Sequence, residues 1–345
     1  MKFPTQTSPH LEANQDVARV MNQVMIALLP GTIVAIWLMG WGVLFNVGLA
    51  VLTALVVEAV MLWLRARPIR PALQDHSAIV LAWILALCLP NLAPWWIPVV
   101  GSLMAVMLAK QLYGGVGFNL FNPAMVGYVI VLVSFPEMMT RWGVDLSVYA
   151  NQLSFSQTAS WMFSGTLPAG MAIDGLTKAT PLDALRAEVA VDGSISSVTT
   201  SIFNPSESWN LWLNLAFLAG GVWLLLTRTI RWHIPVATIA GVVLTSGLLW
   251  LIDPSRFADP GFHLLAGAVI FGAFFVATDP VTSSTTPVGR LIFGFGVGML
   301  AVLIRAFGNY PDGVAFAVLL MNMAVPLIDY YTQPRAFGRK NRGAS

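Results

Sequence analysis

A short polar stretch offers the clearest chemistry in a chain that is otherwise mostly apolar. It reads Asp174-Gly175-Leu176-Thr177-Lys178-Ala179-Thr180-Pro181-Leu182 and lies in the longest non-hydrophobic segment, roughly residues 135–208. Thr180 places a hydroxyl group in a turn-like setting where another protein can reach it. By itself such a residue is an ordinary turn residue, because hydroxyls bond nearby backbone groups. The surrounding pattern decides between these interpretations.

A second motif, Lys110–Pro123, holds three glycines and two asparagines. Glycines let backbone or a ligand approach closely. Asn119 and Asn122 each offer donors and acceptors, which suits the polar edge of a planar heterocycle. Asn122 is also expected to cap the next helix, with Pro123 in its first turn.

Two acids lie in or beside apolar runs and are candidates for ion coupling. Glu58 stands in Val-Val-Glu-Ala-Val, and Asp279 in Ala277–Ser283. A charge at the centre of a membrane helix costs roughly 2.5–3.5 kcal/mol on insertion scales, so Glu58 should face the bundle or a neighbouring subunit, paired or protonated. Asp279 either handles an ion or caps a broken helix, and capping is weighed somewhat above the ion role.

The sequence contains no motif for a metal or haem redox centre or for nucleotide binding. The chain has one cysteine, Cys88, in an apolar run, and four scattered histidines. A thiolate cluster, haem or zinc site needs more ligands at regular spacing. There is no Rossmann glycine pattern or P-loop, and the net charge of +2 gives no reason to expect nucleic-acid binding. The sequence therefore offers no site for nicotinamide or iron–sulfur chemistry in this chain.

The composition indicates a membrane protein. Hydrophobic residues make up 57% and charged residues 10% of the 345, against about 25% charged in soluble domains. Because a span needs about 20 mostly apolar residues, the chain predicts ten helices. They cover roughly 20–40, 43–64, 76–91, 94–110, 118–135, 209–227, 234–252, 262–278, 289–305 and 312–329. The third, fourth, eighth and ninth are expected to be short or broken by proline and glycine.

Charge placement predicts the orientation of these spans. With the amino terminus in the cytoplasm, 13 of the 18 Lys and Arg residues fall on the inner side, Lys110 among them. Both ends are then cytoplasmic and the Thr180 segment is periplasmic. The predicted divisions are a cytoplasmic segment 1–19, a first membrane repeat 20–135, a periplasmic loop 136–208, a second repeat 209–329 and a basic tail 330–345.

The two halves resemble each other. A proline break near Pro90 is followed by an apolar run ending at Lys110, and a break near Pro280 is followed by one ending at Arg305. Five spans in each half give the repeats opposite topology. Inverted repeats with interrupted helices in matching places predict a site near the membrane midplane.

The pattern Asp-x-x-Thr-x-Ala-Thr around Thr180 resembles the flavinylation motif of the RnfD/NqrB family. These are membrane subunits of the Rnf complex and of the sodium-pumping NADH:quinone reductase. The Gly-Gly-x-Gly-x-Asn-x-Phe-Asn-Pro stretch and the segment around Asp279 are also family-like, and the short chain favours the RnfD branch.

The resemblance implies FMN on Thr180 through a phosphoester, attached by a separate flavin transferase that recognises Asp174 and Ala179. It also implies riboflavin in some members, for which Asn119 and Asn122 are candidate contacts. Electrons would pass between NADH and ferredoxin through iron–sulfur and flavin partner subunits, coupled to Na⁺ or H⁺ movement in a bacterial inner membrane.

Two alternatives stay open at this point. Inverted five-helix repeats also build passive channels of the urea-transporter type, and the chain could be a structural scaffold. Neither gives a reason for a flavinylation motif in the outer loop.

Overall fold

Helices are the regular secondary structure of the part of the chain that the structure describes. The computed structural model describes residues 17–143, 153–171, 175–192, 195, 209–308, 310 and 312–333. Six helices are long and apolar enough to cross a membrane: α1 (Val17–Met39), α2 (Gly42–Leu64), α11 (Trp209–Leu226), α12 (His233–Ile252), α15 (Pro287–Phe307) and α16 (Val314–Thr332). At 1.5 Å per residue these helices span about 27–35 Å, the thickness of a bilayer core. The predicted class, an all-α polytopic membrane protein, is confirmed.

Shorter or broken helices occupy the other four predicted spans. They are α4 (Ser77–Leu87), α5 (Trp96–Met104) running into the π-helix η1 (Ala105–Gln111), α6 (Pro123–Ser134), and α13 (Pro260–Leu265) with α14 (Val269–Phe271) and the π-helix η4 (Gly272–Val276).

Two of the predicted span lengths are wrong. The span predicted for 118–135 is helical only from Pro123, because Asn122 before it is extended and caps the helix at that point. The span predicted for 289–305 is not broken. Its proline, Pro287, stands in the first turn, where proline is tolerated, and α15 continues for 21 residues.

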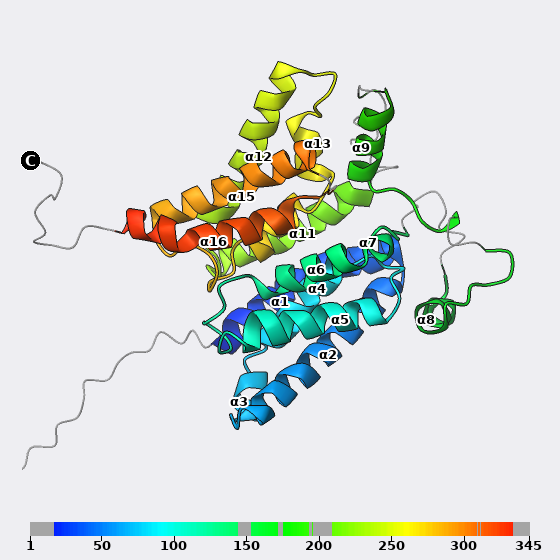
Figure 1. Ribbon diagram of the computed structural model, residues 1–345, viewed down its shortest axis with the longest axis vertical. Coiled ribbons are helices and arrows are strands. Elements are labelled where there is room, and N and C mark those ends of the chain that lie inside the picture. Colours follow the sequence, from blue (N-terminus) through cyan, green and yellow to red (C-terminus); the bar gives the residue numbers. More distant parts are fainter. Residues whose placement is uncertain are drawn as a thin grey trace, which may run out of the picture.

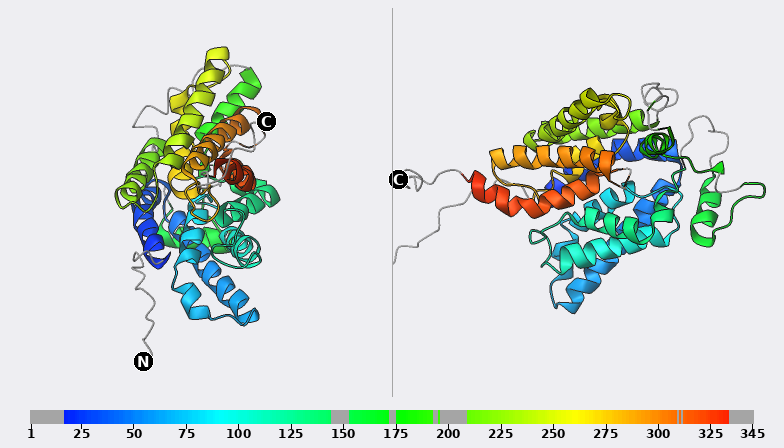
Figure 2. Two further views of the ribbon diagram at one scale, coloured as in Figure 1. Left: turned by 90° about the vertical axis from the view of Figure 1, so that its left-hand side faces the viewer. Right: turned by 45° about the horizontal axis from the view of Figure 1, so that its top comes forward.

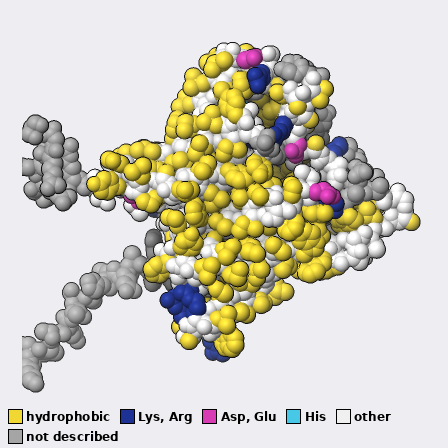
Figure 3. Space-filling model, in the orientation of Figure 1, with side chains coloured by type: hydrophobic (Ala, Val, Ile, Leu, Met, Phe, Trp, Pro, Cys, Tyr) yellow, Lys and Arg dark blue, Asp and Glu magenta, His cyan; other side chains and the backbone are white. Residues whose placement is uncertain are grey.

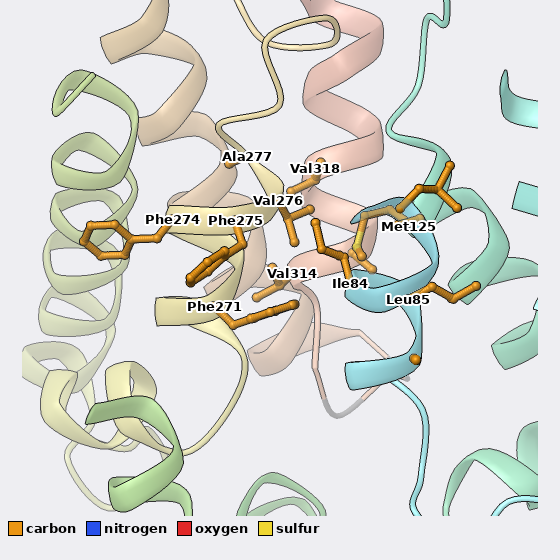
Figure 4. Packing of buried hydrophobic residues seen from close by; sticks show 14 of the residues in the cluster. Ile84, Leu85, Met125, Phe271, Phe274, Phe275, Val276, Ala277, Val314 and Val318 are labelled. Carbon is orange, nitrogen blue, oxygen red and sulfur yellow. The ribbon is translucent and has the colours of Figure 1, made fainter. Parts of the chain in front are cut away.

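The helices form two groups that pack side by side. Helices α1 to α6 make the first and α11 to α16 the second (Figures 1 and 2). Helix α1 packs along α11, and α6 packs along α16. Between them, Ile84 and Met125 of the first group lie beside Val276, Val314 and Val318 of the second (Figure 4). The η4 part of the broken segment therefore lies at the interface of the two halves.

The outer surface is apolar. Hydrophobic side chains cover most of the face in Figure 3, and few charged groups interrupt them. Exposed residues include Leu52 (62%), Trp63 (70%) and Leu244 (56%), all on long helices. An exposed apolar surface of this extent needs a cover, and lipid supplies it in a membrane protein.

Short helices mark the two ends of the bundle. Helices α7 (Pro136–Met139), α8 (Phe155–Ser164) and α9 (Pro181–Asp192) lie on the right in Figure 1. The start of α1 and the end of α16 lie on the opposite side, with α3 (Ile69–Leu73) at the far end of α2. The segment around Thr180 and the two ends of the described chain are thus on opposite sides of the bundle.

Candidate functional site

Thr180 is the residue that caps α9. Its Oγ1 donates to Oδ2 of Asp183 at 2.6 Å, and the Asp183 backbone N–H donates back to Oγ1 at 3.2 Å. The Thr180 N–H also points to Oδ2 of Asp183, at 3.3 Å. This is the reciprocal pattern of a capping box, with an acid in the third helical position and Pro181 in the first. Thr180 is therefore held in one orientation at the helix start.

Contacts on both sides of Thr180 fix its segment to the membrane helices. The Lys178 N–H donates to the Trp142 carbonyl at 2.9 Å. Leu182 is 5% exposed and packs in a cluster with Ala258, Phe262 and Ala266. Further along α9, Arg186 Nη2 donates to the Gly308 carbonyl at 3.1 Å. The apolar residue two positions after Thr180 thus anchors α9 on α13.

The structure says less about Ala179 and Asp174, the two residues predicted to be recognised by a transferase. Ala179 is exposed beside Thr180, where another protein can reach it. Asp174 lies outside the described residues.

The surroundings of Thr180 fit a phosphoester. Thr180 is half-buried at the start of a 12-residue helix, where the helix dipole favours a negative phosphate. Asp183 is the opposing feature, because its carboxylate would face that phosphate as a like charge. The site suits the group once the Asp183 side chain turns away.

Asn122 has the predicted capping role and a second one that joins the two halves. Its Oδ1 accepts from the Met125 N–H at 3.2 Å, as an N-cap should. Its Nδ2 donates to the Val276 carbonyl at 3.2 Å, and its backbone N–H donates to Oδ1 of Asn322 at 3.1 Å. Asn322 in turn donates to the Thr282 carbonyl at 3.0 Å. Two buried amides therefore tie α6 and α16 to the end of the broken helix.

Asn119 is 8% exposed, and its Nδ2 donates to the Phe121 carbonyl at 3.3 Å. A groove of about 510 Å³ lies beside this loop. Its lining is apolar and comes from η1, the loop itself, α6 and α16: Leu108, Ala109, Leu112, Tyr113, Phe121, Val126 and Leu319.

Asp279 has the hydrogen bonds expected of a group that closes a helix break. Its Oδ1 accepts from the Val281 N–H at 3.3 Å and its Oδ2 from the Thr282 hydroxyl at 3.0 Å. Its carbonyl accepts from the Ser283 N–H at 3.1 Å. Thr278 Oγ1 donates to the Phe274 carbonyl at 2.7 Å, so hydroxyls do bond backbone carbonyls near the break.

Glu58 faces the bundle and is paired, as expected for an acid within a span. Its Oε1 lies 2.6 Å from Nζ of Lys110 and accepts from Nε2 of Gln111 at 2.9 Å. Lys110 also donates to Oγ of Ser77 at 2.8 Å, and that hydroxyl donates to Asp75 Oδ1 at 2.5 Å. Oε2 of Glu58 is buried without a partner.

Lys110, which the charge pattern places among the residues of the inner side, is buried, with a side chain only 3% exposed. The π-helical turn at η1 puts Lys110 and Gln111 together on the face toward Glu58. Sequence patterns miss the pair, because its members are far apart in the chain. They also miss Asp183, although a Thr followed three residues later by an acid is a capping signal.

Comparison with known proteins gives one consistent family. The family model described as NQR2, RnfD, RnfE family matches residues 4–338. The chain is 47% identical over 351 residues to the D component of the ion-translocating oxidoreductase complex of Escherichia fergusonii, with 99% of each chain covered. The proteins of the same name from Salmonella paratyphi A and Shigella dysenteriae serotype 1 are 47% and 46% identical, again with 99% of each chain covered.

Proposed function

The chain belongs to the NQR2, RnfD, RnfE family as a membrane subunit of an ion-translocating oxidoreductase complex, and on that premise we propose that it relays electrons through FMN bound covalently to Thr180. Bound FMN supplies the one- and two-electron redox chemistry, and the protein supplies its placement and electrostatics. The relay runs between NADH and ferredoxin through flavin and iron–sulfur partner subunits. A separate flavin transferase attaches the group, with Asp174 and Ala179 as recognition residues.

The observation that carries this proposal is the position of Thr180. Its hydroxyl stands at the amino end of α9, half-buried yet reachable, on a segment anchored by Leu182 and Arg186. A group attached there is held beside α13 and the end of α15, not on a free tether.

We further propose ten crossings arranged as two inverted five-helix repeats in a bacterial inner membrane. Each group begins with two long helices followed by a short or broken one, and this shared order supports the arrangement. With most Lys and Arg residues on the inner side, the ends of the chain are cytoplasmic and α9 is periplasmic. The domain divisions predicted from sequence follow from it.

Coupling to Na⁺ or H⁺ is proposed to involve buried acids. Glu58 is the stronger candidate, because one of its carboxylate oxygens is buried without a partner while the other is paired to Lys110. Asp279 is the weaker, since backbone and hydroxyl donors near the helix break already occupy it.

Riboflavin is proposed for the groove beside Asn119. The size of the groove suits a ring system of that class. Asn122 has less to offer such a ligand, because most of its hydrogen bonds join the two halves.

The test is in-gel flavin fluorescence of the full chain, denatured after co-expression with a flavin transferase. We expect a fluorescent band for the natural chain and none for Thr180→Ala, with peptide mass spectrometry locating FMN on Thr180. A passive channel or a scaffold predicts no chromophore, so a dark band for the natural chain would reject the proposal.

A further inference from the structure

The hydrogen bonds of Thr180 do more than end a helix. In an ordinary capping box, the acid accepts from the backbone N–H of the cap residue. Here the same oxygen, Oδ2 of Asp183, also accepts the hydroxyl proton of Thr180 at 2.6 Å, the shorter of the two contacts. The hydroxyl has one proton and two lone pairs. Its proton points into a carboxylate, one lone pair accepts from the Asp183 N–H, and the other lone pair is free.

We propose that Asp183 is the positioning residue that prepares the Thr180 hydroxyl for esterification, an inference that rests on the proposed function. The reaction it serves takes a flavin dinucleotide as co-substrate. The free lone pair of Oγ1 forms the bond to the phosphorus on the flavin side of the pyrophosphate. The bond from that phosphorus to the bridging oxygen breaks, and AMP leaves with the electron pair. The hydroxyl proton passes to the Asp183 carboxylate and from there to water.

The geometry favours this role for two reasons. The hydroxyl is fixed by two reciprocal bonds to one residue, so its free lone pair has a defined direction. Ala179 beside it is exposed, so this side of the segment is open to a second protein. Proton transfer to a positioned side chain contributes about 10²–10⁴-fold to a rate.

The competing explanation is a cap with no part in the reaction. A transferase that unwinds the first turn of α9 would break the Thr180–Asp183 contacts before the reaction. In that case Asp183 holds the hydroxyl back, and its removal leaves labelling unchanged or makes it faster.

The experiment measures the rate of flavin attachment to the full chain in membranes, using a purified flavin transferase and FAD. The variants are Asp183→Asn, Asp183→Glu and the control Glu188→Gln, which removes an acid further along the same helix. Asparagine keeps an oxygen that can accept from the Thr180 N–H, so it preserves much of the cap while losing the basic carboxylate.

We expect Asp183→Asn to slow attachment by about 100-fold, Asp183→Glu to recover most of the rate, and Glu188→Gln to match the natural chain.

Each other outcome overturns a specific claim. If the natural chain is labelled on Thr180 and Asp183→Asn is labelled equally fast, the role of Asp183 is wrong and the proposed function stands. If the natural chain is not labelled, the proposed function fails first. If Asp183→Asn does not fold, as judged by size-exclusion chromatography in detergent, the rate of flavin attachment to Asp183→Glu tests the role of Asp183 instead. A glutamate variant that folds but is labelled no faster than Thr180→Ala would contradict the role.

Discussion

Two ion pairs, one in each half of the molecule, differ in how completely the oxygens of their acids are bonded. Similar apolar runs end at Lys110 in the first half and at Arg305 in the second. Lys110 pairs with Glu58 of α2 at 2.6 Å, and Arg305 pairs with Asp312 at 3.0 Å. Gly308, just beyond Arg305, bonds Arg186 of α9, whereas Lys110 lies at the opposite end of the bundle.

Both carboxylate oxygens of Asp312, the acid of the second pair, accept hydrogen bonds. Asp312 accepts from Arg305 through Oδ1, from the Ala268 N–H through Oδ2 at 2.8 Å, and from the Val314 N–H at 3.2 Å. Arg305 also donates to the His263 carbonyl at 2.6 Å. This pair closes the ends of three elements beneath α9, which is a structural role.

In Glu58, the acid of the first pair, only one carboxylate oxygen has a partner. Oε2 of Glu58 is buried without a partner, and an unsatisfied buried acceptor costs roughly 1–3 kcal/mol. Such a group needs an explanation, and the coupling proposed for Glu58 would supply one. The comparison shows that two similarly placed cations bind acids that differ in how completely their oxygens are bonded.

The largest expected effect comes from removing Lys110. Lys110→Met leaves Glu58 as an unpaired buried charge, and breaking a buried pair costs about 3–5 kcal/mol. We expect a clear fall in melting temperature in detergent. The double variant Glu58→Gln with Lys110→Met removes both charges and should recover most of that stability.

Ion transport then distinguishes the two roles of this pair. If Glu58 couples electron transfer to ion movement, the stable double variant should assemble with its partners and transfer electrons, but it should not move ions across vesicle membranes. A double variant that is stable and pumps normally would make this pair structural, like the second.

A smaller effect is expected at Asp312. Asp312→Asn weakens the bonds from Arg305 but keeps oxygen and amide groups near the Ala268 and Val314 N–H groups. Losing a hydrogen bond to a charged group costs about 1.5–3 kcal/mol. The melting temperature should fall less than in Lys110→Met, and electron transfer coupled to ion movement should remain. If a stable Asp312→Asn chain loses ion movement coupled to electron transfer, the assignment of a structural role to the Arg305–Asp312 pair is wrong.

The smallest expected effect is a fall in the stability of the folded chain at low pH, through Asp312. Burial alone would raise the pKa of Asp312, but the Arg305 guanidinium and backbone donors outweigh it and hold the pKa below its usual range. A depressed pKa in the folded state gives stability that is present above the unfolded pKa, about 3.9, and is lost as pH falls through the folded pKa. Melting curves in detergent from pH 6 down to about 3 should show this loss in the natural chain and less of it in Asp312→Asn.

Much of the fold follows from local sequence. Long apolar runs predict the six long helices, because only helices satisfy their backbone groups within lipid. The Asn122–Pro123 pair predicts the start of α6, since a cap needs only residues adjacent in the chain. The rule that a membrane acid must be paired also predicts that Glu58 has a partner.

Longer-range contacts are beyond sequence reasoning. Nothing in the chain links Asn122 to Asn322 and Val276, or Glu58 to Lys110, because those contacts depend on how helices cross and on a π-helical turn. The length of α15 is misjudged from sequence because Pro287 suggests a weakened span, although it only begins the helix.

The sequence by itself determined the membrane class, the family and the threonine where a flavin is proposed, because composition, apolar run lengths and short motifs are local properties. Only the tertiary structure decided that Leu182 anchors α9 on α13, and that both carboxylate oxygens of Asp312 have partners while Oε2 of Glu58 has none. Those facts depend on distances between atoms that packing brings together, and the order of residues along the chain does not contain them.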